Sequence, residues 1–386
     1  MTLTILSFIG AAWWLLAVGV LLLSLVCGLI QPRVQARRAR ARAQPPVTAI
    51  LPVKHLDAGF ATTQGSIFEQ DYPDYDILVS AAETRSPALD AMRAIASAHP
   101  QRACRFLHSQ ANFAVSPKLN NIAAPLAQAR GDLILTKDSN VALAPDVMEA
   151  FARNLTPGVG LVVGVPVAFG PRTFAGRIEA SILNAHARLL LSASTLGAGF
   201  GVGKAMLFRR CDLDRLGGVG ALAGNLAEDT ALAEGFAALG LKTVFAHRTL
   251  RQEIGARGLG DVFQRQARWA VIRRANVATY ALEPMASPLP AAAAAGLAAP
   301  LVGLSPGAGF ALTFGGWFCA ETAFAALKGW EISPWSPLAY VGREILALAA
   351  WLRGFATHQV VWADSRFDAR VGPLAPPSGA SRGEKV

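Results

Sequence analysis

A carboxylate follows a short apolar run near the middle of the chain. Residues 132–136 predict a buried strand, and Asp138 lies two positions after its end. At the carboxyl end of a strand, a carboxylate is a hard oxygen ligand for Mg²⁺ or Mn²⁺. Because aspartate at a strand end also caps turns and helices, Asp138 alone does not decide between these two roles.

Two adjacent carboxylates precede a helical pattern. Glu228 and Asp229 come directly before an apolar helical run over residues 230–239, so both would lie at the N-terminus of a helix. One interpretation is that they stabilise the helix dipole and cap the helix. The other is that Asp229 is a general base that takes a proton from an acceptor hydroxyl.

A third cluster is cationic. Arg265 and Arg268 would lie on one face of a helix, with Trp269 beside them and with Arg273 and Arg274 following. Two guanidinium groups on one face could bind a diphosphate. A basic amphipathic helix on anionic lipid has the same pattern, and both interpretations can hold at once.

An α/β domain must position these three clusters. Between residues 47 and 283, short β-branched runs alternate with helical stretches, which predicts a mostly parallel sheet covered by helices. Ligands gather at the carboxyl ends of such strands. The predicted strands are residues 47–53, 76–80, 105–108, 132–136 and 159–165.

Taken together and in this order, the motifs resemble the D, D, D, (Q/R)xxRW pattern of family-2-type glycosyltransferases. They are most similar to the ceramide glucosyltransferase family (family 21) and its bacterial relatives, over about residues 47–283. Arg265 stands where processive polysaccharide synthases usually have Gln, which is also typical of the ceramide branch. Local matches to ceramide glucosyltransferases occur at residues 51–54, 69–73, 116–121 and 203–206.

The resemblance implies a GT-A-type nucleotide-binding domain that inverts the anomeric centre of the sugar in a single displacement. Asp229 would be the catalytic base that deprotonates a lipid hydroxyl, and Asp138 would hold the Mg²⁺ or Mn²⁺ that bridges the diphosphate. Arg268 and Arg265 would stabilise the leaving UDP through charge-assisted hydrogen bonds. The residues implied to bind the nucleotide-sugar are Glu83, Lys118, Asp138, Arg265, Arg268 and Trp269.

Two positions depart from the family pattern. Glu83 stands where the pattern has Asp, and it keeps the charge on a longer stem, which could alter nucleotide affinity or base preference. Asn140 replaces a second carboxylate after Asp138, which leaves a metal with one negative ligand fewer. Trp269 offers a flat apolar face to the sugar or the acceptor, although a structural tryptophan near a membrane has the same signature.

The implied reaction is transfer of glucose from UDP-glucose to ceramide, with a hopanoid polyol or another membrane lipid as the near alternative. Only seven of the 36 basic residues are lysine, a composition typical of GC-rich bacteria. The rival functions are a processive polysaccharide synthase and a non-catalytic membrane protein that binds nucleotide-sugars. The first would need a translocation channel, and the second is opposed by retention of Asp138, Asp229, Arg268 and Trp269.

The first charged residue is Arg33, and residues 5–30 are long enough as a helix to cross a hydrocarbon core of about 30 Å. Residues 1–32 are therefore predicted to be a membrane anchor. Five arginines in the predicted linker, residues 33–46, favour a cytoplasmic side, so the catalytic domain would face the cytoplasm of a bacterial inner membrane. Because the basic cluster adjoins an apolar span, anionic lipid is a nearer partner than nucleic acid.

Membrane segments are also predicted after the catalytic domain, in residues 284–362, which makes a multi-pass protein. Residues 284–320 lack charged side chains and have a turn at 305–307, which predicts a membrane hairpin, with a re-entrant or interfacial segment as the alternative. Residues 336–362 resemble an amphipathic surface helix at least as much as a span. The basic tail, residues 363–386, is predicted to be cytoplasmic and disordered.

Overall fold

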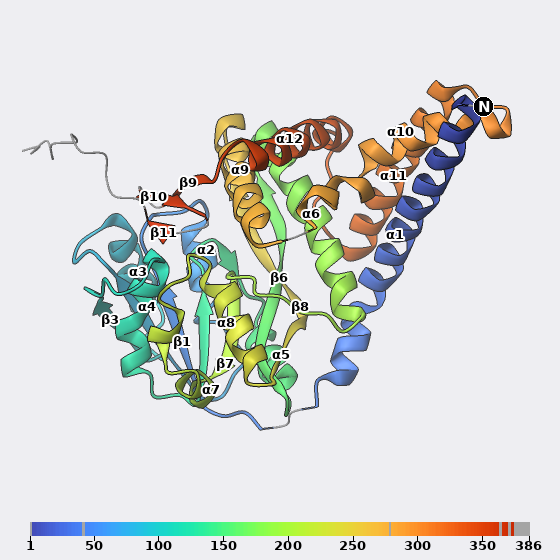
Figure 1. Ribbon diagram of the computed structural model, residues 1–386. Coiled ribbons are helices and arrows are strands. Elements are labelled where there is room, and N and C mark those ends of the chain that lie inside the picture. The colour runs from blue at the N-terminus through green and yellow to red at the C-terminus, as the bar shows by residue number, and fades with distance from the viewer. Residues whose placement is uncertain (1, 41–42, 278, 363–364, 370–371, 374–386) are drawn as a thin grey trace, which may run out of the picture.

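The computed structural model describes residues 2–40, 43–277, 279–362, 365–369 and 372–373. Its main sheet consists of β1 (Val47–Pro52), β2 (Tyr75–Ala81), β3 (Cys104–His108), β4 (Leu133–Lys137), β5 (Val141–Ala142), β6 (Val159–Pro171), β7 (Ala205–Arg209) and β8 (Lys242–Gly255). Within the described residues these eight strands lie in the order β3-β2-β1-β4-β7-β6-β8-β5 (Figure 1).

The five strands predicted from the sequence all form and run in the same direction. β1 is parallel to β2 and β4, and β2 is parallel to β3. β7 lies between β4 and β6 and is antiparallel to both, so β6 points the same way as β4. β8 is parallel to β6, while the short β5 is antiparallel to β8. The prediction of a mostly parallel α/β sheet is confirmed, with β7 as an antiparallel insertion that no pattern predicted.

Helices cover both faces of the sheet. Short 3₁₀ helices, η1 (Val219–Leu222), η2 (Tyr280–Ala286) and η3 (Ala299–Val302), connect some of the elements. The helices of the α/β domain are α2 (Phe60–Gly65), α3 (Pro87–Ser97), α4 (Pro117–Gln128), α5 (Val147–Asn154), α6 (Phe174–Thr195), α7 (Arg210–Arg215), α8 (Glu228–Ala238) and α9 (Leu259–Asn276).

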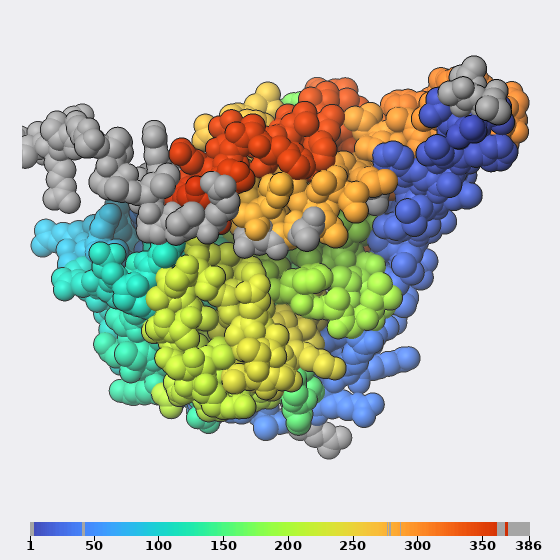
Figure 2. Space-filling view, viewed as in Figure 1, coloured from blue at the N-terminus to red at the C-terminus, as the bar shows by residue number. Residues whose placement is uncertain are grey.

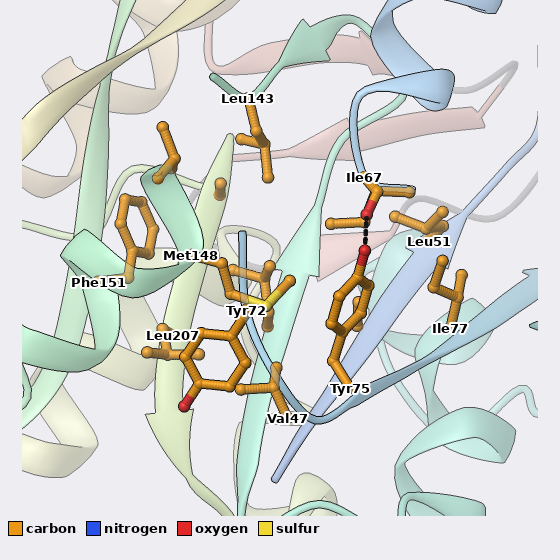
Figure 3. Close-up of a cluster of buried hydrophobic side chains, with 14 of the residues drawn as sticks. Val47, Leu51, Ile67, Tyr72, Tyr75, Ile77, Leu143, Met148, Phe151 and Leu207 are labelled. Carbon is orange, nitrogen blue, oxygen red and sulfur yellow. Dashed lines mark hydrogen bonds between the residues drawn. The ribbon is translucent and has the colours of Figure 1, made fainter. Parts of the chain in front are cut away.

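Alternating side chains of β1 divide the core into two layers, because successive residues of a strand point to opposite faces. Ala49 and Leu51 pack into one layer with α2, α3 and α5. Ile50 packs into the other, with α4, α6, α7 and α8. Figure 3 shows part of the first layer, in which the Tyr75 hydroxyl donates a hydrogen bond of 2.9 Å to the carbonyl oxygen of Ile67.

Three apolar helices extend away from the α/β domain: α1 (Thr2–Arg38), α10 (Pro288–Ala298) and α11 (Pro306–Lys328). α10 and α11 form a helical hairpin in the segment that was predicted to be a membrane hairpin, and both lie beside α1 (Figure 1). Its insertion into a membrane stays a prediction. In the described residues, α1 and α11 are long and apolar enough to cross a membrane by length and composition, while α10 with η3 is shorter.

The segment predicted as a basic linker begins as helix. α1 continues without a break to Arg38, and the described chain is extended only beyond it; Arg42 lies outside the described residues. The end of α1 is bonded to the α/β domain. The Gln31 side-chain amide donates to Ser194 Oγ and to the carbonyl oxygen of Ala246, each at 3.0 Å, and the Gln35 amide donates to Asn154 Oδ1 at 3.0 Å.

α12 (Ser336–Ala356) lies across the top of the molecule (Figures 1 and 2). A surface helix was expected to expose its charged residues, but Arg343 and Glu344 of α12 are buried against the protein. Arg343 pairs with Glu344 at 2.8 Å and with Glu321 of α11 at 2.7 Å, and Glu321 also pairs with Arg188 of α6 at 3.0 Å. The exposed side of α12 is an apolar stripe of Leu338, Val341, Ile345, Leu348, Leu352 and Phe355.

Two strands, β10 and β11, form in the tail that was predicted to be disordered, residues 363–386, and β9 directly precedes that tail. β9 (Gln359–Trp362) pairs with β10 (Ser365–Asp368), which pairs with β11 (Gly372–Pro373). Val360 and Phe367 pack against Val271 of α9, and this burial explains why the segment is ordered. The other positions of the predicted tail lie outside the described residues.

Candidate active site

The carboxyl ends of β1, β2 and β4 surround a cleft of about 500 Å³, which α9 closes on another side. Because parallel strands end at the same edge of a sheet, residues that follow each of them meet there. The cleft lining includes every residue predicted to bind the nucleotide-sugar: Glu83, Lys118, Asp138, Arg265, Arg268 and Trp269.

Asp138 follows the last residue of β4, and its carboxylate lies between two ammonium groups. Lys118 Nζ is 2.7 Å from Oδ1, and Lys204 Nζ is 3.0 Å from Oδ2. Burial opposes ionisation of this carboxyl group, but the charges of Lys118 and Lys204 outweigh burial and lower the pKa of Asp138 to about 2. Asp138 is therefore ionised, with a cation at each oxygen.

Lys118 lies in the first turn of α4 and connects three parts of the site. Its ammonium group donates to Asp138 Oδ1 and, at 2.6 Å, to the carbonyl oxygen of Gly203, and it lies 3.0 Å from Glu228 Oε1. Burial favours the neutral amine, but the carboxylates of Asp138 and Glu228 raise the pKa of Lys118 above its ordinary value. These three acceptors match the three N–H groups of an ammonium.

Lys204 was not among the predicted site residues. It directly precedes β7, whose antiparallel register places Ala205 opposite Lys137 and so brings Lys204 beside Asp138. The backbone N–H of Asp138 donates to the carbonyl oxygen of Lys204 at 2.9 Å, and Lys204 Nζ also donates to Asn140 Oδ1 at 3.3 Å. Lys204 belongs to the matched segment 203–206, but the sequence contains no signal that would have predicted its contact with Asp138.

The predicted base, Asp229, lies in the first turn of α8, as expected. It is half-buried and is not part of the cleft lining. Its Oδ2 accepts a hydrogen bond of 2.7 Å from the backbone N–H of Gly203, so the loop before β7 joins it to the cleft. The neighbouring Glu228 is buried and paired with Lys118, and it therefore has a structural role.

The two arginines of α9 differ in their surroundings. Arg265 Nη1 lies 3.0 Å from Oε1 of the buried Glu179 in α6, and Arg257 lies 3.6 Å from the other oxygen of that carboxylate. Arg268 has no ion pair within the described part of the chain. Burial, and then the adjacent charge of Arg265, lower the pKa of Arg268. Sequence reasoning missed Glu179 because one carboxylate in an amphipathic helix gives no signal of its partner.

The remaining two predicted residues line the cleft without a described polar partner. Glu83 is exposed in the loop after β2, and Trp269 is half-buried on α9. Both side chains are therefore accessible to a ligand in the cleft. The roles assigned to both residues remain predictions.

The residues around Asp138 do not fit a divalent cation in their present arrangement. Hard cations need several oxygen ligands, but both oxygens of Asp138 already contact ammonium groups. Asn140 supplies a neutral oxygen, and Lys204 donates to it. Among the described residues, no group of three or more His, Cys, Asp and Glu side chains could hold a metal ion.

A mixed α/β sheet with a charged cleft at the ends of its parallel strands is a GT-A-type fold. The fold is similar to that of a mannosyltransferase from Pyrobaculum calidifontis solved in complex with GDP-Man and Mn²⁺, with a TM-score of 0.52, 19% sequence identity and coverage of 91% of this chain and 98% of that chain. The chain belongs to glycosyl transferase family 21, whose model matches residues 12–375.

Curated relatives are ceramide glucosyltransferases. The chain is 24% identical over 232 residues to ceramide glucosyltransferase 1 of Caenorhabditis elegans, which covers 59% of this chain and 50% of that protein. It is 27% identical over 241 residues to the ceramide glucosyltransferase of Komagataella phaffii, covering 55% of this chain and 46% of that protein. The chain thus matches about half the length of these relatives.

Proposed function

We propose that this chain is an inverting glycosyltransferase that transfers a sugar, glucose, from a UDP-sugar to a hydroxyl group of a membrane lipid, ceramide. The observation that carries the proposal is the cleft itself, in which the six residues of the predicted donor site line one space. Family membership and the names of the curated relatives support the lipid acceptor.

Cationic side chains of the cleft stabilise the diphosphate as it leaves. Arg268 lines the cleft and is not neutralised by a carboxylate in the described structure, so its guanidinium can bind phosphate oxygens in a bidentate way. Trp269, one residue further along α9, offers its ring to the sugar or to the acceptor. Glu83 contacts the nucleotide from the opposite side, as a hydrogen-bond acceptor for base or ribose.

Asp229 removes the proton from the acceptor hydroxyl. A general base needs an ionised carboxylate in a fixed orientation, and two backbone N–H groups hold this one. The hydroxyl oxygen attacks the anomeric carbon while the bond to the diphosphate breaks on the opposite face, which inverts the configuration. Asp229 ends with the proton, and UDP leaves with the electron pair of the broken bond.

A divalent cation held by Asp138 is the alternative source of positive charge at the diphosphate. The related mannosyltransferase was solved with Mn²⁺. Because Lys118 and Lys204 contact both oxygens of Asp138, however, the fit here is poor, and we assign no step to a metal ion.

The proposed setting is a bacterial inner membrane, with the cleft on the cytoplasmic side. The apolar helices α1 and α11 and the exposed apolar stripe of α12 support membrane binding. Arg33, Arg37 and Arg38, at the α/β end of α1, support the cytoplasmic side. In sealed right-side-out membranes, external protease should leave the α/β domain intact, and its digestion would refute this orientation.

The reaction can be tested with radiolabelled UDP-glucose and membranes that contain the full-length chain. Label in an organic-extractable product that depends on added ceramide supports the proposal, and dependence on a hopanoid polyol would change only the acceptor. Label in an insoluble polymer would instead indicate a polysaccharide synthase. No transfer with retained UDP binding would indicate a non-catalytic binding protein.

A further inference from the structure

We infer that the ammonium group of Lys204 takes the place of a divalent cation at the donor diphosphate, so that this transferase works without a metal ion. The inference rests on the proposed function, because it concerns the binding of a nucleoside diphosphate in the same cleft. Lys204 would donate directly to the phosphate oxygens, and the expected divalent cation would not be required.

Lys204 lies where a divalent cation would be bound. Its Nζ lies 3.0 Å from Asp138 Oδ2 and 3.3 Å from Asn140 Oδ1, so it contacts the two side chains that would otherwise supply oxygen ligands to a cation. Its carbonyl oxygen also accepts the backbone N–H of Asp138 at 2.9 Å. Main chain and side chain together hold the ammonium group at the carboxylate.

Lys204 and Lys118 differ in the number of N–H donors that already have an acceptor. An ammonium group has three N–H donors. Lys118 faces three acceptors, on Asp138, Gly203 and Glu228. Lys204 has two acceptors in the described structure and lines the cleft, which leaves one N–H for a phosphate oxygen.

The charges around Asp138 also favour an anionic ligand over a second cation. The carboxylates of Asp138 and Glu228 are matched by the ammonium groups of Lys118 and Lys204, so these four paired side chains carry no net charge before a ligand binds. A divalent cation at Asp138 would add two positive charges beside two existing ones, and repulsion opposes it. An anionic diphosphate, in contrast, is attracted by Lys204 and by Arg268 across the cleft.

The inference can be tested by titrating UDP into the full-length protein in EDTA and, separately, in excess Mn²⁺. The wild type should bind UDP in EDTA at least as tightly as in Mn²⁺, because Mn²⁺ complexes part of the free UDP in solution. Lys204→Met should bind it about 10- to 100-fold more weakly in EDTA, the usual effect of losing one charge-assisted hydrogen bond. Lys204→Arg keeps the charge and should stay within a few-fold of the wild type.

Lys242→Met is the matched control. Lys242 is an exposed lysine at the start of β8, at the edge of the sheet opposite the cleft, so this variant should bind UDP as the wild type does. Circular dichroism and thermal melting of each variant show whether a loss of binding reflects unfolding. The EPR spectrum of Mn²⁺ with UDP should be the same with and without the wild-type protein, which would show that the protein does not bind the Mn²⁺ ion.

Each result decides between distinct conclusions. Wild-type protein that binds UDP or transfers sugar only with Mn²⁺ overturns the inference and leaves the proposed function intact. A folded Lys204→Met that binds UDP normally in EDTA also overturns it. Wild-type protein that neither binds UDP nor transfers sugar in either buffer refutes the proposed function, and the inference falls with it.

Discussion

The carboxylate of Asp229 accepts a hydrogen bond from the backbone N–H of Gly203, with 2.7 Å between Oδ2 and the nitrogen. Its Oδ1 accepts the N–H of Thr230 at 2.8 Å. Two backbone donors thus fix the orientation of the carboxylate, while its other lone pairs remain available to accept a proton. The loop that positions the proposed base also carries Lys204, which contacts Asp138.

Asp229→Asn should abolish sugar transfer and preserve UDP binding. The amide keeps the size of the carboxylate but cannot accept the proton, and general-base catalysis typically contributes about 10² to 10⁴ in rate. Because an amide has only one oxygen, one of the two backbone hydrogen bonds is also lost, and this should lower stability by about 1 kcal/mol. Single-turnover transfer rates, UDP titration and thermal melting measure the three effects.

Glu234→Gln is the appropriate control for Asp229→Asn. Glu234 is exposed on the same helix, so its change should alter neither transfer nor stability. Glu228→Gln, the nearest carboxylate variant by sequence, is unsuitable because Glu228 is buried and paired with Lys118. Near-wild-type turnover by folded Asp229→Asn would require another base.

Gly203→Ala should reduce transfer strongly. A methyl group at Gly203 would lie 3.1 Å from Glu228 Oε1, 3.3 Å from Asp229 Oδ2 and 3.4 Å from Lys118 Nζ, so these side chains would have to move. Displacement of the base and of Lys118 should lower kcat/KM by at least about 10-fold. Gly220→Ala has open space for its methyl group and should be active. Equal activity of the two variants would argue against this loop as a positioning element.

Arg265 and Arg268 should affect different measurements. Arg265→Met leaves the buried Glu179 with only Arg257, and it should lower stability by about 1–3 kcal/mol. Arg268→Met removes no ion pair in the described structure, and it should lower kcat/KM about 10- to 100-fold at an unchanged melting temperature. Adding Glu179→Gln to Arg265→Met should restore part of the lost stability. If Arg268→Met lowered stability and Arg265→Met lowered only kcat/KM, the roles proposed for the two arginines would have to be exchanged.

Glu83→Gln should weaken UDP binding without destabilising the protein, because Glu83 is exposed at the cleft and has no partner in the described structure. The loss should be about 10-fold, as for one hydrogen bond to a charged group. Glu83→Asp, which restores the family residue, tests whether the longer stem matters. Unchanged affinity of both variants in calorimetric titrations would remove Glu83 from the donor site.

Patterns in short stretches of the sequence predicted individual strands and helices. The strand before Asp138 and the helix after Asp229 follow from apolar periodicity, and both form as expected. The shared cleft also follows, because parallel strands end at one edge. The residues predicted to bind the donor could therefore be grouped from the order of the motifs alone.

Partners that come from distant or antiparallel segments could not be predicted. Lys204 reaches Asp138 only because β7 inserts antiparallel beside β4, and five residues of regular β pattern do not reveal their neighbours. Glu179 meets Arg265 through the packing of α6 on α9. The tail was predicted to be disordered because its end, from Pro373, is rich in Pro, Gly and Ser, yet Phe367 packs against an apolar surface of α9.

In the proposed membrane setting, α1 connects the membrane rigidly to the α/β domain. It stays helical to Arg38, and the side chains of Gln31 and Gln35 form hydrogen bonds with the α/β domain. A rigid connection of this kind fixes the distance of the cleft from the bilayer surface and the orientation of the cleft relative to the bilayer. Each residue inserted into the helix would raise the domain by about 1.5 Å and rotate it by roughly 100°. The enzyme would then work at one depth in the lipid headgroup layer, and acceptors whose hydroxyl group lies at another depth would be excluded by geometry.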